Sequence, residues 1–211
     1  MKKTFRTLGL FCAAAVLAGL MAAGAEAAPF GKEDLKRMSV FISNFTELGF
    51  YDLDVKNESD EALYLGGPDA APDLIRFGIW HNYVNNFKSR IKKCAKKDCE
   101  HGSLTIEGKF VQESVKKYFD LNLKNQSVMG STPSYYFDGK LYHFEGADGE
   151  AVYYAEVKEA SLEDGVVRMS GELYNAEDKK DRLGTFQAVA KPYKWKGKDT
   201  WAILSLRSEL K

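Results

Sequence analysis

The chain has no charge imbalance and very few histidines and cysteines, and each shortage narrows the chemistry open to it. Its 30 basic and 30 acidic residues cancel, so no overall field attracts nucleic acid or an anionic membrane. Histidine occurs three times, as His81, His101 and His143. The local motifs of nucleotide-binding proteins, serine hydrolases and zinc proteases are absent. These shortages lower the expectation of an enzyme, although a site can still be assembled from distant residues.

Long hydrophobic runs are also scarce, since a single one stands at residues 8–20. Lys2, Lys3 and Arg6 precede it, and an Ala-Glu-Ala sequence ending at Ala27 follows. This order is typical of a secretory signal peptide and is too short for a membrane span. We expect cleavage near Ala27 and a periplasmic or secreted bacterial protein. The cleavage removes three of the 30 basic and one of the 30 acidic residues, which leaves 27 and 29 and a formal net charge of −2.

Two cysteines remain after this cleavage, Cys94 and Cys99, with four residues between them. In an oxidising compartment such a pair favours a disulfide, and closing so small a ring contributes about 2 kcal/mol. Free thiols, a redox-active pair and a metal site are the alternatives. The spacing differs from the C-x-x-C of redox-active pairs, and a zinc site would need His101 as third ligand and a fourth that the sequence does not reveal.

The first half of the mature chain is predicted to be helical. Apolar residues recur every three or four positions over residues 33–48 and again over 74–91, where Asp73 is the expected N-cap. A shorter helix is expected from about Ile106 to Phe119, with Thr105 as a candidate N-cap.

From Ser134 the period of the apolar residues changes to two, which is typical of half-buried strands. Asp138-Gly139 and Asp164-Gly165 are turn signals between such segments. The expected strands cover residues 135–137, 140–144, 151–159, 166–174, 183–191 and 200–207. We therefore predict a single α+β domain over residues 28–211, mainly helical to 130 and an antiparallel sheet from 131. Its helices should pack on one face of a curved, mostly antiparallel sheet of about five to six strands.

A resemblance covers roughly the last hundred residues. Tyr118-Phe119, Asp138-Gly139-Lys140, Ala147-Asp148-Gly149 and the stretch from Gly197 to Trp201 are similar to the tail of uncharacterised exported bacterial proteins. The order of helices and strands resembles the cystatin-like and nuclear-transport-factor-like superfold. The resemblance implies a fold and no particular activity, because that superfold hosts enzymes, ligand-binding proteins and interaction modules.

Aromatic residues are concentrated in the predicted sheet, where rings on the face away from the helices would line a ligand site or a docking surface. The candidate contact residues are Tyr136, Tyr142, Phe144, Tyr154 and Tyr174. The leading hypothesis is a non-enzymatic, cofactor-free module that binds a small molecule, a glycan or another envelope protein.

Two other hypotheses stay open. One is a small hydrolase or isomerase of the same fold, in which His143 or His81 acts as general base with Glu145 or Asp138 nearby. The other is homodimerisation through the exposed sheet.

Overall fold

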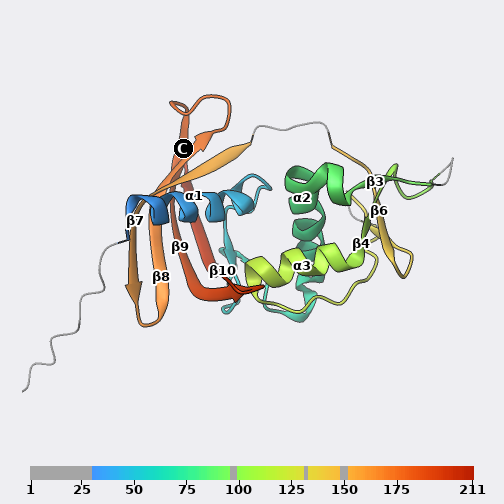
Figure 1. Ribbon diagram of the computed structural model, residues 1–211, viewed down its shortest axis with the longest axis horizontal. Helices are drawn as coiled ribbons and strands as arrows, with labels where there is room; N and C mark the ends of the chain where they lie inside the picture. The colour runs from blue at the N-terminus through green and yellow to red at the C-terminus, as the bar shows by residue number, and fades with distance from the viewer. Residues whose placement is uncertain (1–29, 96–98, 131–132, 148–151) are drawn as a thin grey trace, which may run out of the picture.

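The computed structural model describes residues 30–95, 99–130, 133–147 and 152–211 (Figure 1). The predicted signal peptide and its cleavage site near Ala27 lie outside these residues, as does most of the Ala147-Asp148-Gly149 motif. Among the described residues, no helix has the length and apolar character needed to cross a membrane.

The α+β fold is confirmed, with helices preceding most of the strands. The helices of the described residues are α1 (Lys32–Thr46), η1 (Pro68–Ala70), α2 (Ala71–Arg90) and α3 (Gly108–Phe119). A six-stranded sheet has the order β2-β1-β10-β9-β8-β7. Its strands are β1 (Leu53–Asp54), β2 (Leu63–Tyr64), β7 (Tyr153–Glu163), β8 (Val166–Asn175), β9 (Arg182–Trp195) and β10 (Lys198–Leu210). All its neighbouring pairs are antiparallel except β1 with β2.

A second sheet was not foreseen. It has the order β3-β4-β6-β5 and is built from β3 (Lys92–Lys93), β4 (Leu104–Glu107), β5 (Tyr136–Phe137) and β6 (Leu141–Phe144). The hairpin of β5 and β6 therefore leaves the large sheet and pairs with β4 through Thr105 opposite His143. Alternation in a sequence identifies strands but does not say which strand they pair with. Figure 1 shows this small sheet at the far side of α2 and α3 from the large one.

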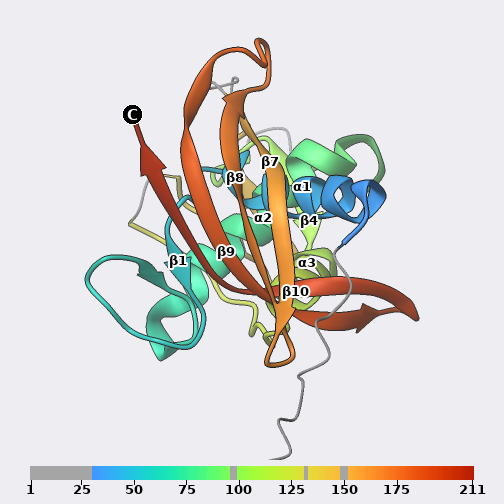
Figure 2. The ribbon, with the colours of Figure 1, turned by 90° about the vertical axis from the view of Figure 1, so that its left-hand side faces the viewer.

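Helix α1 covers the outer edge of β7, and its hydroxyl side chains form hydrogen bonds with the backbone N–H and C=O groups of that edge. The backbone N–H groups of Ala155 and Val157 donate to Ser43 Oγ and Ser39 Oγ, each at 2.9 Å. Thr46 Oγ1 donates to the Tyr153 carbonyl at 2.7 Å. An uncovered edge strand would offer these groups to another chain, so the hydroxyls close off an aggregation-prone edge. Figure 2 shows β7 to β10 side by side, with α1 beside β7.

Helix α2 packs on α3 and β4. Asn82 is fully buried between the two helices, where its Nδ2 donates to the Gly78 carbonyl and to Ser114 Oγ. The backbone departs from helical geometry at Asn86 (φ −136°, ψ 19°), near the end of the helix. Val84 and Phe87, expected on the buried stripe, are 48% and 42% exposed.

The predicted N-caps of two helices are wrong. Asp73 lies inside the first turn of α2, whose cap is Ala70, and it pairs with Arg76 at 3.5 Å. Thr105 lies in β4, and α3 begins later, after Glu107. Both residues lie close to the start of the helix. Asp73, however, is already inside the helix, and Thr105 is still part of a strand.

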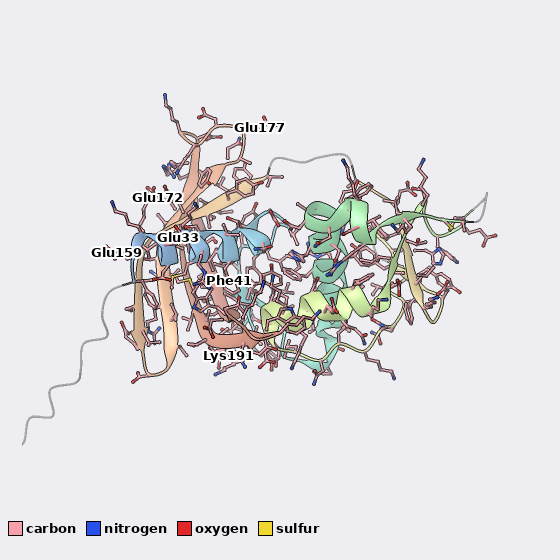
Figure 3. The ribbon with its side chains drawn as sticks, in the orientation of Figure 1. Glu33, Phe41, Glu159, Glu172, Glu177 and Lys191 are labelled. Atoms are coloured by element: carbon pink, nitrogen blue, oxygen red, sulfur yellow. A yellow bond between two sulfur atoms is a disulfide. The ribbon has the colours of Figure 1, made fainter. Side chains whose placement is uncertain are left out.

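The three helices meet in a cluster of buried aromatic rings. Phe45 contacts Phe77 at 5.3 Å between ring centroids, and Phe77 contacts Phe119 at 4.7 Å. Phe41, labelled in Figure 3, points from α1 toward α3 and β10, where its ring contacts Tyr118 and Trp201. Edge-to-face and offset pairs of this kind add to the energy of burial, so the cluster connects α1, α2, α3 and the large sheet.

The long hairpins of the large sheet turn on left-handed residues. Asp164 and Gly165, where the sequence predicts a turn, have φ of 50° and 77°, as in a type I′ turn. The β9–β10 turn is shorter than expected, since it uses Lys196 and Gly197 alone. Pro192 therefore lies within β9. It is tolerated there because β8 pairs with β9 only as far as Ala190, so the missing N–H would have no partner in β8.

Candidate functional site

A hollow of about 600 Å³ lies between α1 and the end of the large sheet formed by β7 and β8. On one side it is lined by Lys36 and Val40 of α1 and by Glu47, the residue that caps the end of α1, and on the sheet side by Tyr154 and Tyr174. The connection between β8 and β9, marked by Glu177 in Figure 3, contributes Lys179. The hollow thus brings together two of the five aromatic residues singled out from the sequence.

Tyr154 and Tyr174 are direct cross-strand partners on β7 and β8. Their rings meet edge to face with centroids 6.1 Å apart. Lys179 and Arg182 approach the Tyr174 ring at 5.3 Å and 5.5 Å, within range of a cation–π contact. These contacts hold both rings, which are half-buried, at the wall of the hollow.

Charged groups on the sheet side of the hollow are paired with one another. Glu156 forms ion pairs with Lys158, Lys179 and Arg182 at 2.7, 2.7 and 3.2 Å. The hydrogen bonds from Lys158 and Lys179 lower the pKa of Glu156 to about 2, so this carboxylate stays charged at any physiological pH. The network fixes Lys179 beside Tyr174 and neutralises the carboxylate in the wall.

Helix α1 supplies the opposite wall and its polar groups. Lys32 and Lys36 are exposed on it. Toward the end of α1, Glu47 accepts a hydrogen bond from Asn85 Nδ2 at 2.8 Å. Burial raises the pKa of Glu47 above its ordinary value, and the bond from Asn85 opposes that rise.

The other three aromatic candidates do not reach this hollow. Tyr142 and Phe144 are fully buried in the small sheet, two residues apart and so on the same core-facing side. The Tyr142 hydroxyl donates to Asn125 Oδ1 at 3.2 Å, and burial raises its pKa to about 12. Tyr136 is half-buried and stacks on His101, with ring centroids 4.0 Å apart.

A second cluster of reactive side chains lies in the small sheet, around the disulfide between Cys94 and Cys99. This disulfide confirms the pairing expected from the sequence. The nearly buried side chain of His143 lies beside it, with Nδ1 3.2 Å from Cys99 Sγ and 3.7 Å from Cys94 Sγ. The other ring nitrogen, Nε2, lies 3.1 Å from Asp138 Oδ2.

Asp138 reaches His143 because of the local turn geometry. Its N–H donates to the Leu141 carbonyl, so the turn is centred on Gly139 and Lys140 and not on Asp138-Gly139. Asp138 Oδ1 accepts the backbone N–H groups of Leu141 and Lys140 at 2.7 and 2.9 Å. These bonds, with the Leu141 N–H first and His143 next, lower the pKa of Asp138 to about 2. The second carboxylate oxygen of Asp138, Oδ2, is then free to contact Nε2 of His143.

Two side chains considered from the sequence have other roles in the structure: Glu145 is not the carboxylate that contacts His143, and His101 is not the third side chain beside the cysteines. Glu145 bonds the Ser103 backbone N–H and hydroxyl at 2.9 and 2.8 Å. Among the described residues, the third side chain at the two sulfur atoms is His143.

His81 is buried beside the aromatic cluster. Its ring lies parallel to that of Phe77 and edge-on to that of Tyr118, with centroid distances of 5.7 and 4.7 Å. Burial, followed by the charges of Lys117 and Arg90, lowers its pKa to about 3. Such a group is neutral at pH 7, but its low basicity makes it a weak proton acceptor.

Comparisons of the chain with protein-family models, curated proteins and solved structures give no match. The site geometry alone therefore carries the functional argument.

Proposed function

We propose that this protein is an exported, non-enzymatic binding module of the bacterial envelope that holds a short glycan in the hollow between α1 and β7. The observation that carries the proposal is the meeting of Tyr154 and Tyr174 with the polar side chains of α1 around one hollow. Concave sites with aromatic walls and a few placed polar groups are typical of small-ligand binding.

A carbohydrate suits this lining better than a purely apolar ligand. The half-buried tyrosine rings offer flat faces to the C–H groups of a sugar ring, and their hydroxyls stay available to water or ligand. Glu47 and Asn85 at one end and Lys36 along the wall supply acceptors and donors for sugar hydroxyls. Glu156 is already neutralised by Lys158 and Lys179, so its negative charge does not repel an anionic ligand. The hollow therefore suits a sugar that is neutral or bears a carboxylate, which the lysines of α1 could pair with.

The geometry gives less support to the hydrolase or isomerase hypothesis. For His143, Asp138 faces one ring nitrogen and the disulfide faces the other. For His81, the buried position and a pKa of about 3 disfavour proton abstraction at neutral pH. Neither histidine lines the hollow.

The test is a calorimetric titration of the mature chain, residues 28–211, with chitohexaose, maltohexaose and an oligogalacturonate. We expect at least one of these probes to bind, and Tyr154→Ala and Tyr174→Ala each to weaken that binding about tenfold, since a ring contact worth about 1.4 kcal/mol corresponds to that factor. Tyr153→Ala is the matched control, because its ring lies on the opposite face of the same strand against Tyr51. The proposal fails if none of the three probes binds, or if the control loses as much affinity as the two variants.

A further inference from the structure

The cluster of Cys94, Cys99, His143 and Asp138 has a geometry that a disulfide alone does not require. The two sulfur atoms and His143 Nδ1 all lie within 4.8 Å of one another. We propose that the reduced protein binds Zn²⁺ through Cys94, Cys99 and His143, with Asp138 positioning the imidazole. This site is separate from the glycan hollow and does not rest on it.

The separations between the ligand atoms already match those around tetrahedral zinc. Bonds of about 2.3 Å to sulfur and about 2.1 Å to nitrogen place a nitrogen and a sulfur ligand about 3.6 Å apart. The observed distances from His143 Nδ1 to Cys99 Sγ and Cys94 Sγ are 3.2 and 3.7 Å. Once the disulfide is reduced, the two sulfur atoms need to separate to about 3.8 Å, while the histidine can stay where it is.

Asp138 fixes the tautomer that a metal ligand needs. An ionised carboxylate only accepts hydrogen bonds, so the contact of 3.1 Å between Asp138 Oδ2 and His143 Nε2 places the proton on Nε2. In the neutral ring, the lone pair then lies on Nδ1, which faces the two sulfur atoms. A carboxylate on the far nitrogen is the usual partner of a zinc-binding histidine.

The local fold holds these groups in place without the metal. Cys94 donates its N–H to the Ser103 carbonyl at 2.8 Å, which extends the pairing of β3 with β4 up to the cysteine. His143 lies on β6 directly opposite Thr105 of β4. The spacing of four residues between the cysteines lies within the range seen for zinc ligands. Three protein ligands leave one coordination position for water or a substrate atom, as in catalytic zinc sites.

The disulfide and the metal site exclude each other, so the cluster is redox-dependent. An external dithiol reduces the Cys94–Cys99 bond to two thiols and is itself oxidised to a disulfide. Zn²⁺ then displaces one proton from each thiol and binds the two thiolates and His143 Nδ1. Oxidation of the thiolates by an external disulfide reverses the sequence and releases the metal.

The experiment titrates the anaerobic, phosphine-reduced mature chain with Co²⁺, followed by Zn²⁺. We expect one Co²⁺ per chain, a sulfur-to-cobalt charge-transfer band, the visible bands of tetrahedral cobalt, and displacement of both by one equivalent of Zn²⁺. The protein with its disulfide intact should show none of these bands. Absence of the charge-transfer band in the reduced protein, or a complex of one metal with two chains, would overturn the proposal.

Variants separate the roles of the side chains. Cys99→Ser and His143→Ala should remove the tetrahedral spectrum, and Asp138→Asn should keep it while weakening the affinity about tenfold. His101→Ala is the matched control, because His101 stacks on Tyr136 and is not among the side chains whose ligand atoms cluster with the two sulfur atoms. An unchanged spectrum in His143→Ala would contradict the assignment, and so would loss of the spectrum in His101→Ala.

A measurement on the unmodified protein covers the case in which His143→Ala fails to fold. Zinc binding should shift the ¹⁵N resonance of Nδ1 in His143 and leave those of His81 and His101 in place. A shift at either of the other two histidines would refute the ligand set.

Discussion

The free energy of unfolding of the wild type should fall between pH 6.5 and pH 4, and replacing His81 with leucine should abolish most of that decrease. The folded state holds His81 neutral, since burial first, and Lys117 and Arg90 next, lower its pKa from 6.5 to about 3. In the unfolded chain the ring takes up its proton near pH 6.5. Between these values the unfolded state binds more protons, so the free energy of unfolding falls as the pH falls.

The size of this effect follows from the two pKa values. Between pH 6.5 and pH 4 the difference in proton binding at a single site with a folded pKa of about 3 costs about 3 kcal/mol. Glu47, held next to His81 by Asn85, contributes with the opposite sign because its pKa is raised in the folded state. The quantity to compare is therefore the slope of the free energy of unfolding against pH in wild type and variant. Glu47, Lys117 and Arg90 are present in both proteins, so their contributions largely cancel in this comparison.

The assay is urea unfolding of the mature chain at half-unit steps of pH over this window. His81→Leu costs packing at every pH, so its curve should start lower and be flatter than that of the wild type. His101→Leu serves as the control and should keep the wild-type slope. Equal slopes for wild type and His81→Leu would refute the account of His81 as a buried neutral histidine.

Three further predictions concern the fold. Ser43→Ala removes the acceptor of the Ala155 N–H at the edge of β7 and should lower the free energy of unfolding by about 1–2 kcal/mol, whereas Ser89→Ala, whose hydroxyl bonds only at the exposed end of α2, should change it little in the same urea titration. Gly78→Ala should cost about 1–3 kcal/mol by thermal unfolding, since a Cβ there would lie 2.6 Å from a methyl carbon of Val111 and 2.9 Å from its carbonyl. The double variant Cys94→Ala/Cys99→Ala should lose about 2 kcal/mol, and an unchanged midpoint of unfolding would show that the disulfide adds nothing.

Features that depend on local sequence were predictable. The stripe of α1, the Asp164-Gly165 turn and the alternation of β8 reflect contacts between residues close in the chain. The pairing of Cys94 with Cys99 was predictable for the same reason, since five positions separate them. The two tyrosines of the hollow were named as candidates from composition and alternation, but the wall opposite them was not.

Features that depend on partners far along the chain were not predictable. A polar residue such as Asn82 is expected on the exposed face of a helix, yet it is fully buried because α3 packs over it and supplies Ser114. The pairing of β6 with β4 brings His143 to the cysteines, and no local pattern encodes that pairing.

The sequence already placed Asp138 among the carboxylates near His143, and the contact between the two side chains has a local explanation. In a hairpin that turns on Gly139 and Lys140, Asp138 lies opposite Leu141, and His143 is two residues further along on the same face. The turn expected at Asp138-Gly139 is one residue too early, so the sequence did not show that Asp138 lies opposite Leu141. The side chain of Asp138, which takes the N–H groups of Lys140 and Leu141, decides the register of the turn.

The most direct test of glycan binding is an NMR search for intermolecular contacts between an oligosaccharide that binds and the aromatic rings of the protein. We expect nuclear Overhauser effects from sugar C–H protons to the ring protons of Tyr154 and Tyr174. Effects confined to other rings, such as those of Tyr193 or Trp195 at the far end of β9, would contradict it.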